Sequence, residues 1–423
     1  MTNRMSWLAA GIAALAAAPL PAQTIAIEGG RVHTMTGAPI EGGTVLIRDG
    51  VIVAVGAGIA VPAGAIRVDA RGKQVTPGLF ESATRIGLTE VGSIPGTNDF
   101  AMNEDDRVTA AFNVADGLNP RSIVIPVTRV AGVTTAVAAP GGGFVKGQGV
   151  IIDLAGLDGP EMIVRSPVAM FASLGETAEQ AGGGARAGAT MRLRELLEDA
   201  RAYARNRAAY ERGETREYAT SRLDLEALQP VLRGELPLVI EAHRASDIRG
   251  ALRLAAEYDL RMILEGGTEA WMVAGDLARA RVPVLVKVLG NLPDSFERLG
   301  ARYDNAALLR RAGVQVAITT GDTHNARNIK QEAGNAVAYG LPWDEALKAI
   351  TLYPAQIWGV ADRYGSLAPG KVANVVVWGG DPLELLTPVE AVFIRGAQIP
   401  MVSRETQLRD RYMRLDETRS YRN

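Results

Sequence analysis

The sequence predicts an α/β fold, in which a barrel of alternating strands and helices carries a smaller β-rich module built from both chain ends. Short strand-like segments separated by glycine-containing turns fill residues 24–75 and return at 365–399. Between them, residues 76–359 alternate apolar strand candidates with helical patterns, as repeated βα units do. Hydrophobic residues make up 47% of the chain and aromatic residues only 5%, a balance that suits parallel sheets covered by helices.

The two β-rich ends are expected to form one unit. TIAIEGG, TVLIRDG and VIVAVG near the start resemble NVVVWGG and VEAVFIRG near the end in length and turn chemistry. We therefore expect residues 23–75 and 360–400 to make a composite β-sandwich, with the barrel of residues 76–359 inserted between its halves. A charged, helical tail is expected over residues 401–423.

The middle of the chain contains the clearest strands and helices. Strands are predicted at VTTAVAA, PLVIEA, RMILEG, PVLVKV and VQVAIT. Apolar residues recur at helical spacing over 247–258 and 328–339, and the second of these patterns ends at Gly340, a suitable C-terminal cap. LPWDEALKAIT opens a further helix with acidic residues in its first turn. The arginine-rich segment 191–216 predicts a helix with a solvated face, and the glycine runs 141–143 and 182–184 predict loops.

The first residues have the layout of a secretory signal peptide. Arg4 precedes an apolar run over residues 7–18, which small residues and proline follow. Cleavage is expected after Ala22, giving a leader of residues 1–22 and a periplasmic or secreted protein. The alternative is an uncleaved anchor, but the run is shorter than the roughly 20 residues that span a bilayer. No later segment predicts a membrane span.

Charge and cysteine content exclude several classes of protein. Acidic and basic residues number 47 and 45, so no basic surface for nucleic acid is expected, and a small-molecule ligand fits better. The chain has no cysteine, which excludes disulfides and thiolate metal sites. Imidazole comes only from His33, His243 and His324, few for a two-metal enzyme.

An ordered series of segments resembles the amidohydrolase superfamily, in the order and spacing of its imidazolonepropionase-like branch. The series runs through GKQVTPGLFESATRIGL, AGVTTAVAAPGG, HRASDI, EGGTEAW, ALKAITLYPAQIWGV and GSLAPGKVANVVVWGGDPLE. The resemblance implies a (β/α)8 TIM-like barrel with a composite β-sandwich formed by both chain ends, and a site at the carboxyl end of the barrel strands. It also implies hydrolysis of C–N bonds in amides, lactams or cyclic amides, through one or two divalent ions that activate water.

The family's metal-binding histidines are largely replaced in this chain. The His-x-His pair that follows the first barrel strand falls on Ala83 and Arg85, neither of which offers a lone pair to a cation. Where family members near this branch read His-Ala-His-Arg, this chain has Glu241 and His243 in the histidine positions. Gly266 stands where the sixth strand would supply a histidine, and no lysine occurs in residues 163–171 to bridge two ions.

An acid does remain at the eighth strand. Asp322 lies in VQVAITTGDTHN, two residues before His324, and both are candidate catalytic residues. Glu241, His243 and Asp322 are the candidate ligands if one zinc or manganese ion binds, although a site without any ion is favoured. His33 is expected to be structural.

We take three further residues, Arg85, Arg244 and Glu265, as candidate substrate-binding residues. A guanidinium at position 85 would pair with Glu241 and Asp322 in place of a metal, or would grip a carboxylate ligand. Lys146, in GGFVKGQG, is expected to be a solvated loop residue, and the alternative is a lysine that reaches a ligand from the loop.

Two classes of function follow. The first is hydrolysis of a C–N bond at an impaired or altered site, since water without a metal is a poor nucleophile. The second is a non-catalytic relative that binds a small ligand or pairs with an active homologue. A homo-oligomer is a further expectation for the partners of this protein.

Overall fold

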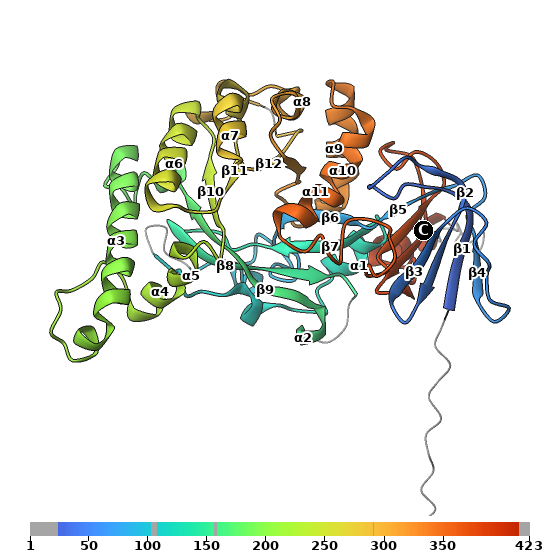
Figure 1. Ribbon diagram of the computed structural model, residues 1–423, viewed down its shortest axis with the longest axis horizontal. Helices are drawn as coiled ribbons and strands as arrows, with labels where there is room; N and C mark the ends of the chain where they lie inside the picture. The colour runs from blue at the N-terminus through green and yellow to red at the C-terminus, as the bar shows by residue number, and fades with distance from the viewer. Residues whose placement is uncertain (1–23, 103–107, 156–158, 291, 414–423) are drawn as a thin grey trace, which may run out of the picture.

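The fold is built on two large β-sheets, one of them nearly closed into a barrel. The computed structural model describes residues 24–102, 108–155, 159–290 and 292–413, so the expected leader and the last ten residues of the tail lie outside the described residues. Figure 1 shows the barrel sheet with its helices on one side of the molecule and the second sheet on the other. Within the described ranges, no helix has the length and apolar character needed to cross a bilayer.

The second sheet takes its strands from both parts of the chain. Its strands are β1 (Thr24–Val32), β2 (Ile40–Arg48), β3 (Val51–Gly56), β4 (Ile66–Asp69), β5 (Gln74–Pro77), β14 (Val375–Trp378), β15 (Val389–Ile394) and β16 (Ala397–Gln398). The order is β16-β15-β14-β5-β1-β2-β3, and β4 also pairs with β1. The antiparallel pair of β5 and β14 joins the two halves, with Val75 opposite Val377. Apolar side chains of both halves, such as Ile27 and Phe393, share one core.

The barrel sheet contains eight strands in sequence order. These are β6 (Leu79–Thr84), β7 (Val133–Ala138), β8 (Val145–Asp153), β9 (Ile163–Ser173), β10 (Leu238–Ala242), β11 (Met262–Gly266), β12 (Val284–Val286) and β13 (Val316–Ile318). All neighbours are parallel except around β8, which runs antiparallel to both β7 and β9. The third strand therefore departs from a regular βα repeat. The start of β8, and not its end, therefore lies at the carboxyl end of the neighbouring strand β9, where Val145 pairs with Ala172.

A buried carboxyl group joins the first and last barrel strands. Glu81 of β6 is fully buried, and its carboxylate accepts hydrogen bonds from the Thr319 hydroxyl and from the backbone N–H of Thr320 at 3.1 Å. Burial raises the pKa of Glu81 to about 7, although these hydrogen bonds act against the shift. The side chain of Glu81 thus completes the contact between β6 and the segment after β13.

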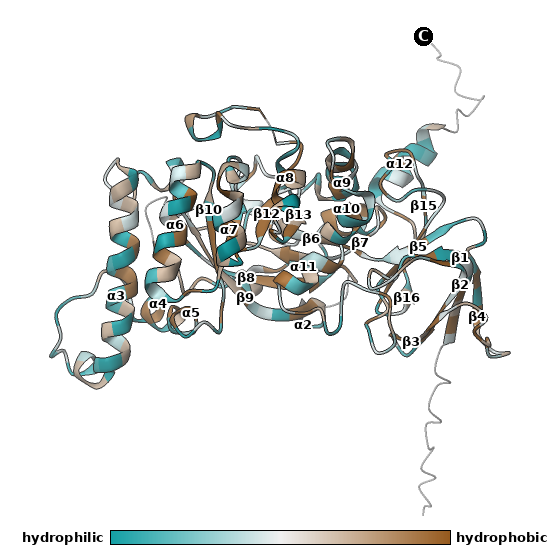
Figure 2. Ribbon diagram, turned by 45° about the horizontal axis from the view of Figure 1, so that its top comes forward, coloured by the Kyte–Doolittle hydropathy of each residue, from teal (hydrophilic) through white to brown (hydrophobic). Residues whose placement is uncertain are grey.

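Helices cover the outside of the barrel (Figure 1). They are α1 (Val124–Arg129), α2 (Gly159–Met162), α3 (Arg186–Glu211), α4 (Arg222–Ala227), α5 (Gln229–Leu232), α6 (Ala245–Tyr258), α7 (Ala274–Ala280), α8 (Asn305–Arg311), α9 (Ile329–Ala338), α10 (Trp343–Ala349) and α11 (Leu352–Ile357). The last helix, α12 (Arg404–Met413), contacts α1 and has no buried residue. Short 3₁₀ turns occur at Pro95–Thr97, Val114–Gly117, Glu176–Ala178, Ala270–Val273, Phe296–Arg298 and Ala326–Asn328. Figure 2 shows apolar residues concentrated on the strands, while polar residues band the outer faces of α3 and α6.

The main predicted strands and helices are confirmed within two or three residues. The five predicted strands appear as β7, β10, β11, β12 and β13, and the helical patterns appear as α6, α9 and α10. The arginine-rich segment falls within α3 and its succeeding turn, with Leu193 and Leu197 buried under a solvated face. The loop expected around Lys146 is wrong, because this residue is the second of β8. In the first half of that strand Gly147 and Gly149 are buried and alternate with the half-buried Lys146 and Gln148, so the glycine-rich segment is a strand and not a loop.

Candidate active site at the barrel mouth

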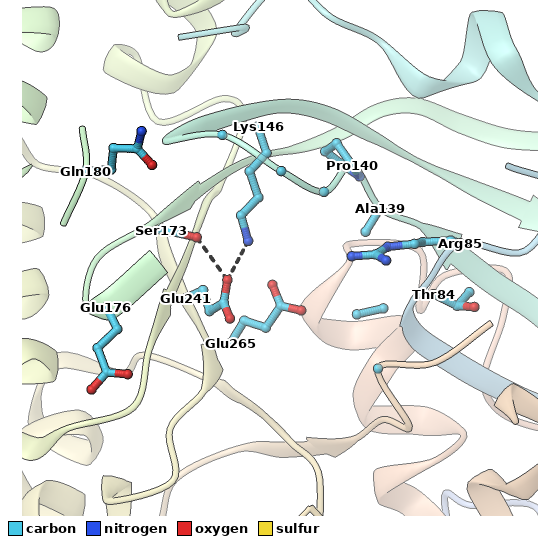
Figure 3. Close-up of a pocket in the computed structure, with 15 residues that line it drawn as sticks. Thr84, Arg85, Ala139, Pro140, Lys146, Ser173, Glu176, Gln180, Glu241 and Glu265 are labelled. Carbon is cyan, nitrogen blue, oxygen red and sulfur yellow. Dashed lines mark hydrogen bonds and ion pairs between the residues drawn. The ribbon is translucent and has the colours of Figure 1, made fainter. Parts of the chain in front are cut away.

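A cavity of about 520 Å³ opens at the mouth of the barrel, among residues that follow or end its strands. Figure 3 shows the side chains that line it. Polar groups come from four neighbouring strands: Lys146 from β8, Ser173 from β9, Glu241 from β10 and Glu265 from β11. The remaining lining residues are Ala83, Thr84, Arg85, Ala139, Pro140, Gly141, Gly142, Gly143, Glu176, Gln180 and Gly321. The cavity therefore has the size of a small-molecule site, and its polar groups are suited to a polar ligand.

The ammonium group of Lys146 and the carboxylate of Glu241 form a buried ion pair. Nζ lies 2.5 Å from Oε2, and the two side chains are 11% and 21% exposed. The Ser173 hydroxyl donates to the same oxygen at 2.9 Å. Lys146 holds the pKa of Glu241 well below its usual range against the opposing effect of burial. The pKa of Lys146 is raised because the attraction of Glu241 and Glu265 exceeds the opposing effect of burial, so both partners remain charged. The expectation of a solvated Lys146 is wrong.

A second carboxyl group stands beside this pair. Glu265 occupies the position on β11 directly opposite Glu241 on β10. Burial raises the pKa of Glu265, and repulsion from Glu241 adds to the effect, while Lys146 acts against it. Two neighbouring carboxyl groups thus have pKa values displaced in opposite directions. One stays ionised, and the other exchanges its proton closer to neutrality.

Arg85 lies on the far wall of the cavity from Lys146 (Figure 3). Its guanidinium carbon sits 3.8 Å above the centre of the Phe100 ring. The expected pairing of Arg85 with Glu241 and Asp322 is wrong, since the described residues include no acid within ion-pair distance of this guanidinium. Burial lowers the pKa of Arg85, and the attraction of Glu265, Glu241 and Asp322 acts against that shift from longer range.

His243 faces the same region but its ring is already bonded on both sides. Nδ1 lies 2.8 Å from the Thr268 hydroxyl, and Nε2 lies 3.1 Å from Nη2 of Arg298. Because a guanidinium only donates, Nε2 must accept, which assigns the ring proton to Nδ1. Gly266 packs against this ring, and a Cβ at Gly266 would lie 2.5 Å from it. The loss of a side chain at position 266 and the placement of His243 are therefore linked.

The donor groups at the barrel mouth do not fit the divalent ion that the resemblance implies. Two of the corresponding positions, Ala83 and Arg85, offer no lone pair. Oε2 of Glu241 is bonded to the ammonium group of Lys146, and the Nε2 lone pair of His243, 3.6 Å from Oε1 of Glu241, is directed at Arg298. Across residues 24–102, 108–155, 159–290 and 292–413, no three His, Asp or Glu side chains are grouped to hold an ion.

The other predicted site residues lie apart from this cluster. Asp322 borders a smaller cleft beside Lys287, where the backbone N–H and side-chain amide of Asn325 bond its carboxylate at 3.2 and 3.1 Å. Burial raises the pKa of Asp322, but the bonds from Asn325 outweigh this and the net pKa is lowered. His324 is exposed and bonds the Glu90 carbonyl. Arg244 pairs with Asp247 at 2.8 Å at the start of α6.

The sequence therefore predicted three of these five residues at the barrel mouth. Glu241, Glu265 and Arg85 line one cavity, as candidate site residues should. Ser173 was missed, and a ligand-facing Lys146 was only the less favoured alternative, because both roles depend on the antiparallel strand β8 and on the end of β9, which no motif marks. His33 is structural, as predicted: it is buried, bonds Gln74 at 2.7 Å and packs on Trp343.

Comparison with known proteins gives one consistent result. A model of the family described as "Amidohydrolase family" matches residues 195–401. The crystal structure of an amidohydrolase from Thermotoga maritima MSB8 aligns with a TM-score of 0.81 and 30% identity, covering 89% of this chain and 99% of that one. Molinate hydrolase, at 18% identity and a TM-score of 0.56, shares the fold.

Curated relatives match over shorter shares of their length. Amidohydrolase tasK of Hapsidospora irregularis is 26% identical over 366 residues, which cover 79% of this chain and 37% of that protein. The imidazolonepropionase of Polaromonas sp. is 30% identical over 186 residues, which cover 41% of this chain and 40% of that enzyme. The matched region thus spans well under half the length of each of these relatives.

Proposed function

This chain belongs to the amidohydrolase superfamily, in its imidazolonepropionase-like branch, and from that premise we propose that it hydrolyses a C–N bond of a small amide, lactam or cyclic amide without a divalent ion. One observation carries the proposal: neighbouring strands hold a fixed ammonium–carboxylate pair, Lys146 and Glu241, beside a carboxyl group with a raised pKa, Glu265. These groups supply a fixed positive charge and a proton acceptor in one cavity. Both are needed to cleave an amide.

Glu265 is the proposed acid–base residue. Its carboxylate takes a proton from water as the water oxygen attacks the carbonyl carbon, and the ammonium group of Lys146 stabilises the negative charge that develops on the carbonyl oxygen. The protonated Glu265 then delivers this proton to the leaving nitrogen. The C–N bond breaks, giving a carboxylic acid and an amine. Glu241 keeps Lys146 charged and positioned.

The reaction is expected to be slow relative to metal-dependent family members. Water that is not bound to a metal keeps a pKa far above neutrality, so a carboxylate alone activates it weakly. We therefore propose an impaired or altered activity rather than the full rate of the family. A cavity built around an ammonium group also selects different substrates from one built around an ion.

Turnover by metal-stripped protein tests the proposal. A panel of N-acyl amino acids, lactams and cyclic amides should include a substrate that the chelator-treated protein cleaves, and Glu265→Gln should reduce that rate at least a hundredfold. Asp322→Asn is the matched comparison, because Asp322 remains the alternative base from the sequence. If Asp322→Asn abolishes turnover while Glu265→Gln does not, the assignment of the proton transfer to Glu265 fails.

A second candidate is a protein that binds a small ligand, or pairs with an active homologue, without turnover. It is favoured by the loss of donor atoms at Ala83, Arg85 and Gly266. Saturable binding of a ligand in the cavity, with no turnover by wild-type protein across the panel, would establish this candidate over the first.

Export and the sandwich-like module are also proposals. The layout of residues 1–22 supports export to the periplasm or medium, and N-terminal sequencing of the mature protein should begin at Gln23. The sheet shared by β5 and β14 supports the composite β-sandwich formed by both ends. We retain a homo-oligomer as a further proposal, which light scattering would test.

A further inference from the structure

We propose that Arg85 is the residue that recognises an anionic group of the ligand, so that the molecule bound in this cavity carries a single carboxylate. The part of this inference that concerns the cleaved bond rests on the proposed function. Recognition of the carboxylate is argued from the residues of the cavity alone, and a binding measurement tests it.

The guanidinium of Arg85 is held in place by Phe100 and Gly141. The ring of Phe100 lies under one face, 3.8 Å from the guanidinium carbon. Gly141 closes the position from the side, and a Cβ there would come within 2.8 Å of Nη2 of Arg85 and of the Phe100 ring. Only a residue without a side chain leaves room for this placement. A stacked guanidinium is held in one plane, and its N–H groups remain directed outward from the edge.

The edge of this guanidinium has no acidic partner within the part of the chain that the structure describes. Other arginines near the cavity are neutralised: Arg186 contacts Glu176 at 3.3 Å and Glu179 at 3.1 Å, and Arg244 contacts Asp247. Arg85 instead lines the cavity directly. A ring-stacked cation that lines the cavity with free donors is suited to a ligand that supplies the missing charge.

The balance of charge in the cavity leaves room for one negative charge. Lys146 and Glu241 cancel each other at 2.5 Å, and Glu176 is paired with Arg186. Glu265 is the remaining acid among the described residues that line the cavity, and in the ionised form that the proposed hydrolysis uses it interacts more strongly with Lys146 than with Arg85. Among the described residues no acid contacts Arg85, so one carboxylate of the ligand pairs with it. A second negative charge, as on a phosphate monoester, would have no cation to pair with.

The geometry also sets where the anionic group stands on the ligand. Figure 3 shows Arg85 on one wall and Lys146 on the other, with Glu265 between them. A carboxylate bound by the fork of Arg85 therefore leaves the opposite end of the ligand near Lys146 and Glu265. The ligand class is a small amide that carries its carboxylate at the end remote from the scissile carbonyl.

Binding of matched ligands tests the inference without requiring turnover. Calorimetry on the full chain should show that N-acyl amino acids bind wild-type protein at least tenfold more tightly than their carboxamides, which differ only in charge. Arg85→Gln should remove this preference, because it should weaken binding of the acids far more than binding of the carboxamides. Arg85→Lys should restore part of it, because an ammonium keeps the charge but loses the two-pronged geometry.

Two further variants separate recognition from folding. Gly141→Ala keeps the cation but displaces it and the Phe100 ring, so it should weaken carboxylate binding while circular dichroism shows an unchanged fold. Arg121→Gln, at an exposed arginine outside the cavity lining, is the control and should change neither. Equal affinity of wild-type protein for acids and carboxamides, or tighter binding of phosphate esters, would overturn the inference. Carboxylate-selective binding without turnover would uphold it while contradicting the proposed hydrolysis.

Discussion

Nζ of Lys146 lies 2.5 Å from Oε2 of Glu241, although the two residues belong to strands that are not neighbours in the sheet. The strand between theirs, β9, supplies Ser173, whose hydroxyl donates to the same oxygen at 2.9 Å. Three successive strands thus meet at one carboxylate oxygen. This meeting depends on the reversed direction of β8, which brings the start of that strand to the barrel mouth. The reversed strand thereby places the ammonium group of Lys146 in the cavity at the barrel mouth, where the proposed hydrolysis takes place.

Replacing Lys146 by Met should destabilise the protein by about 3 kcal/mol at neutral pH, because a buried carboxylate at Glu241 would lose its partner. The pKa of Glu241 would then rise above its usual range, so the variant should recover stability as the pH falls through that range. Wild-type protein should show the opposite trend, since a lowered pKa gives stability that is lost in acid. Denaturant unfolding at several pH values measures both.

Lys73→Met serves as the control, because Lys73 makes an exposed pair with Glu390 and should change stability by less than about 1 kcal/mol. A double variant, Lys146→Met with Glu241→Gln, should regain much of the lost stability, since neither member of the pair then carries a charge. Equal stability of wild-type protein and Lys146→Met across the pH range would rule out a structural ion pair.

Hydrolysis should depend on pH through Glu265. Its pKa is raised by burial and by Glu241, with Lys146, His243 and Arg85 acting in the opposite direction. As the base must be ionised, kcat/KM should rise with pH through an apparent pKa above 4.5, the ordinary value. This apparent pKa belongs to the Glu241–Glu265 pair jointly. A pH–rate profile of a cleaved substrate checks this, and a rate that is flat from pH 4 to 8 would speak against Glu265 as the base.

The carboxyl group that closes the barrel should make stability depend on pH near neutrality. Burial raises the pKa of Glu81 from 4.5 to about 7, so its contribution is fully present below the ordinary carboxyl range and is lost as the pH rises through 7. The loss should amount to about 3 kcal/mol, the free-energy equivalent of this shift. Chemical unfolding at pH 5 and pH 8 measures it.

Glu81→Gln cannot ionise, so its free energy of unfolding should vary much less than that of wild-type protein between these two pH values. Glu390→Gln, an exposed acid of the second sheet, is the matched control and should keep the wild-type dependence. If the Glu81→Gln variant follows the wild-type curve, another group causes the pH dependence.

The sequence indicated most of the architecture because the relevant patterns are local. Apolar strands such as VQVAIT and the helical spacing of 247–258 need no distant contact to be recognised. The motif positions also identified the losses at Ala83, Arg85 and Gly266. A strand direction is not local: β8 reverses because of its pairing with β7 and β9, and nothing near Lys146 in the sequence marks that choice.

The pairing of charges was harder to predict for the same reason. Arg85 was expected to neutralise Glu241, since both were assigned to the barrel mouth. The structure gives that role to Lys146, and the arginine is held away by the ring of Phe100 and by the space that Gly141 leaves. Motif positions place residues at the mouth of a barrel, but side-chain packing decides which of them touch.

Metal analysis of protein purified from its native compartment shows whether the ammonium group of Lys146 stands in for a divalent ion. We expect no stoichiometric zinc or manganese, and a melting temperature and rate of hydrolysis that chelator treatment leaves unchanged. One equivalent of tightly bound zinc or manganese, whose removal abolishes hydrolysis and whose return restores it, would mean that an ion and not Lys146 supplies the positive charge.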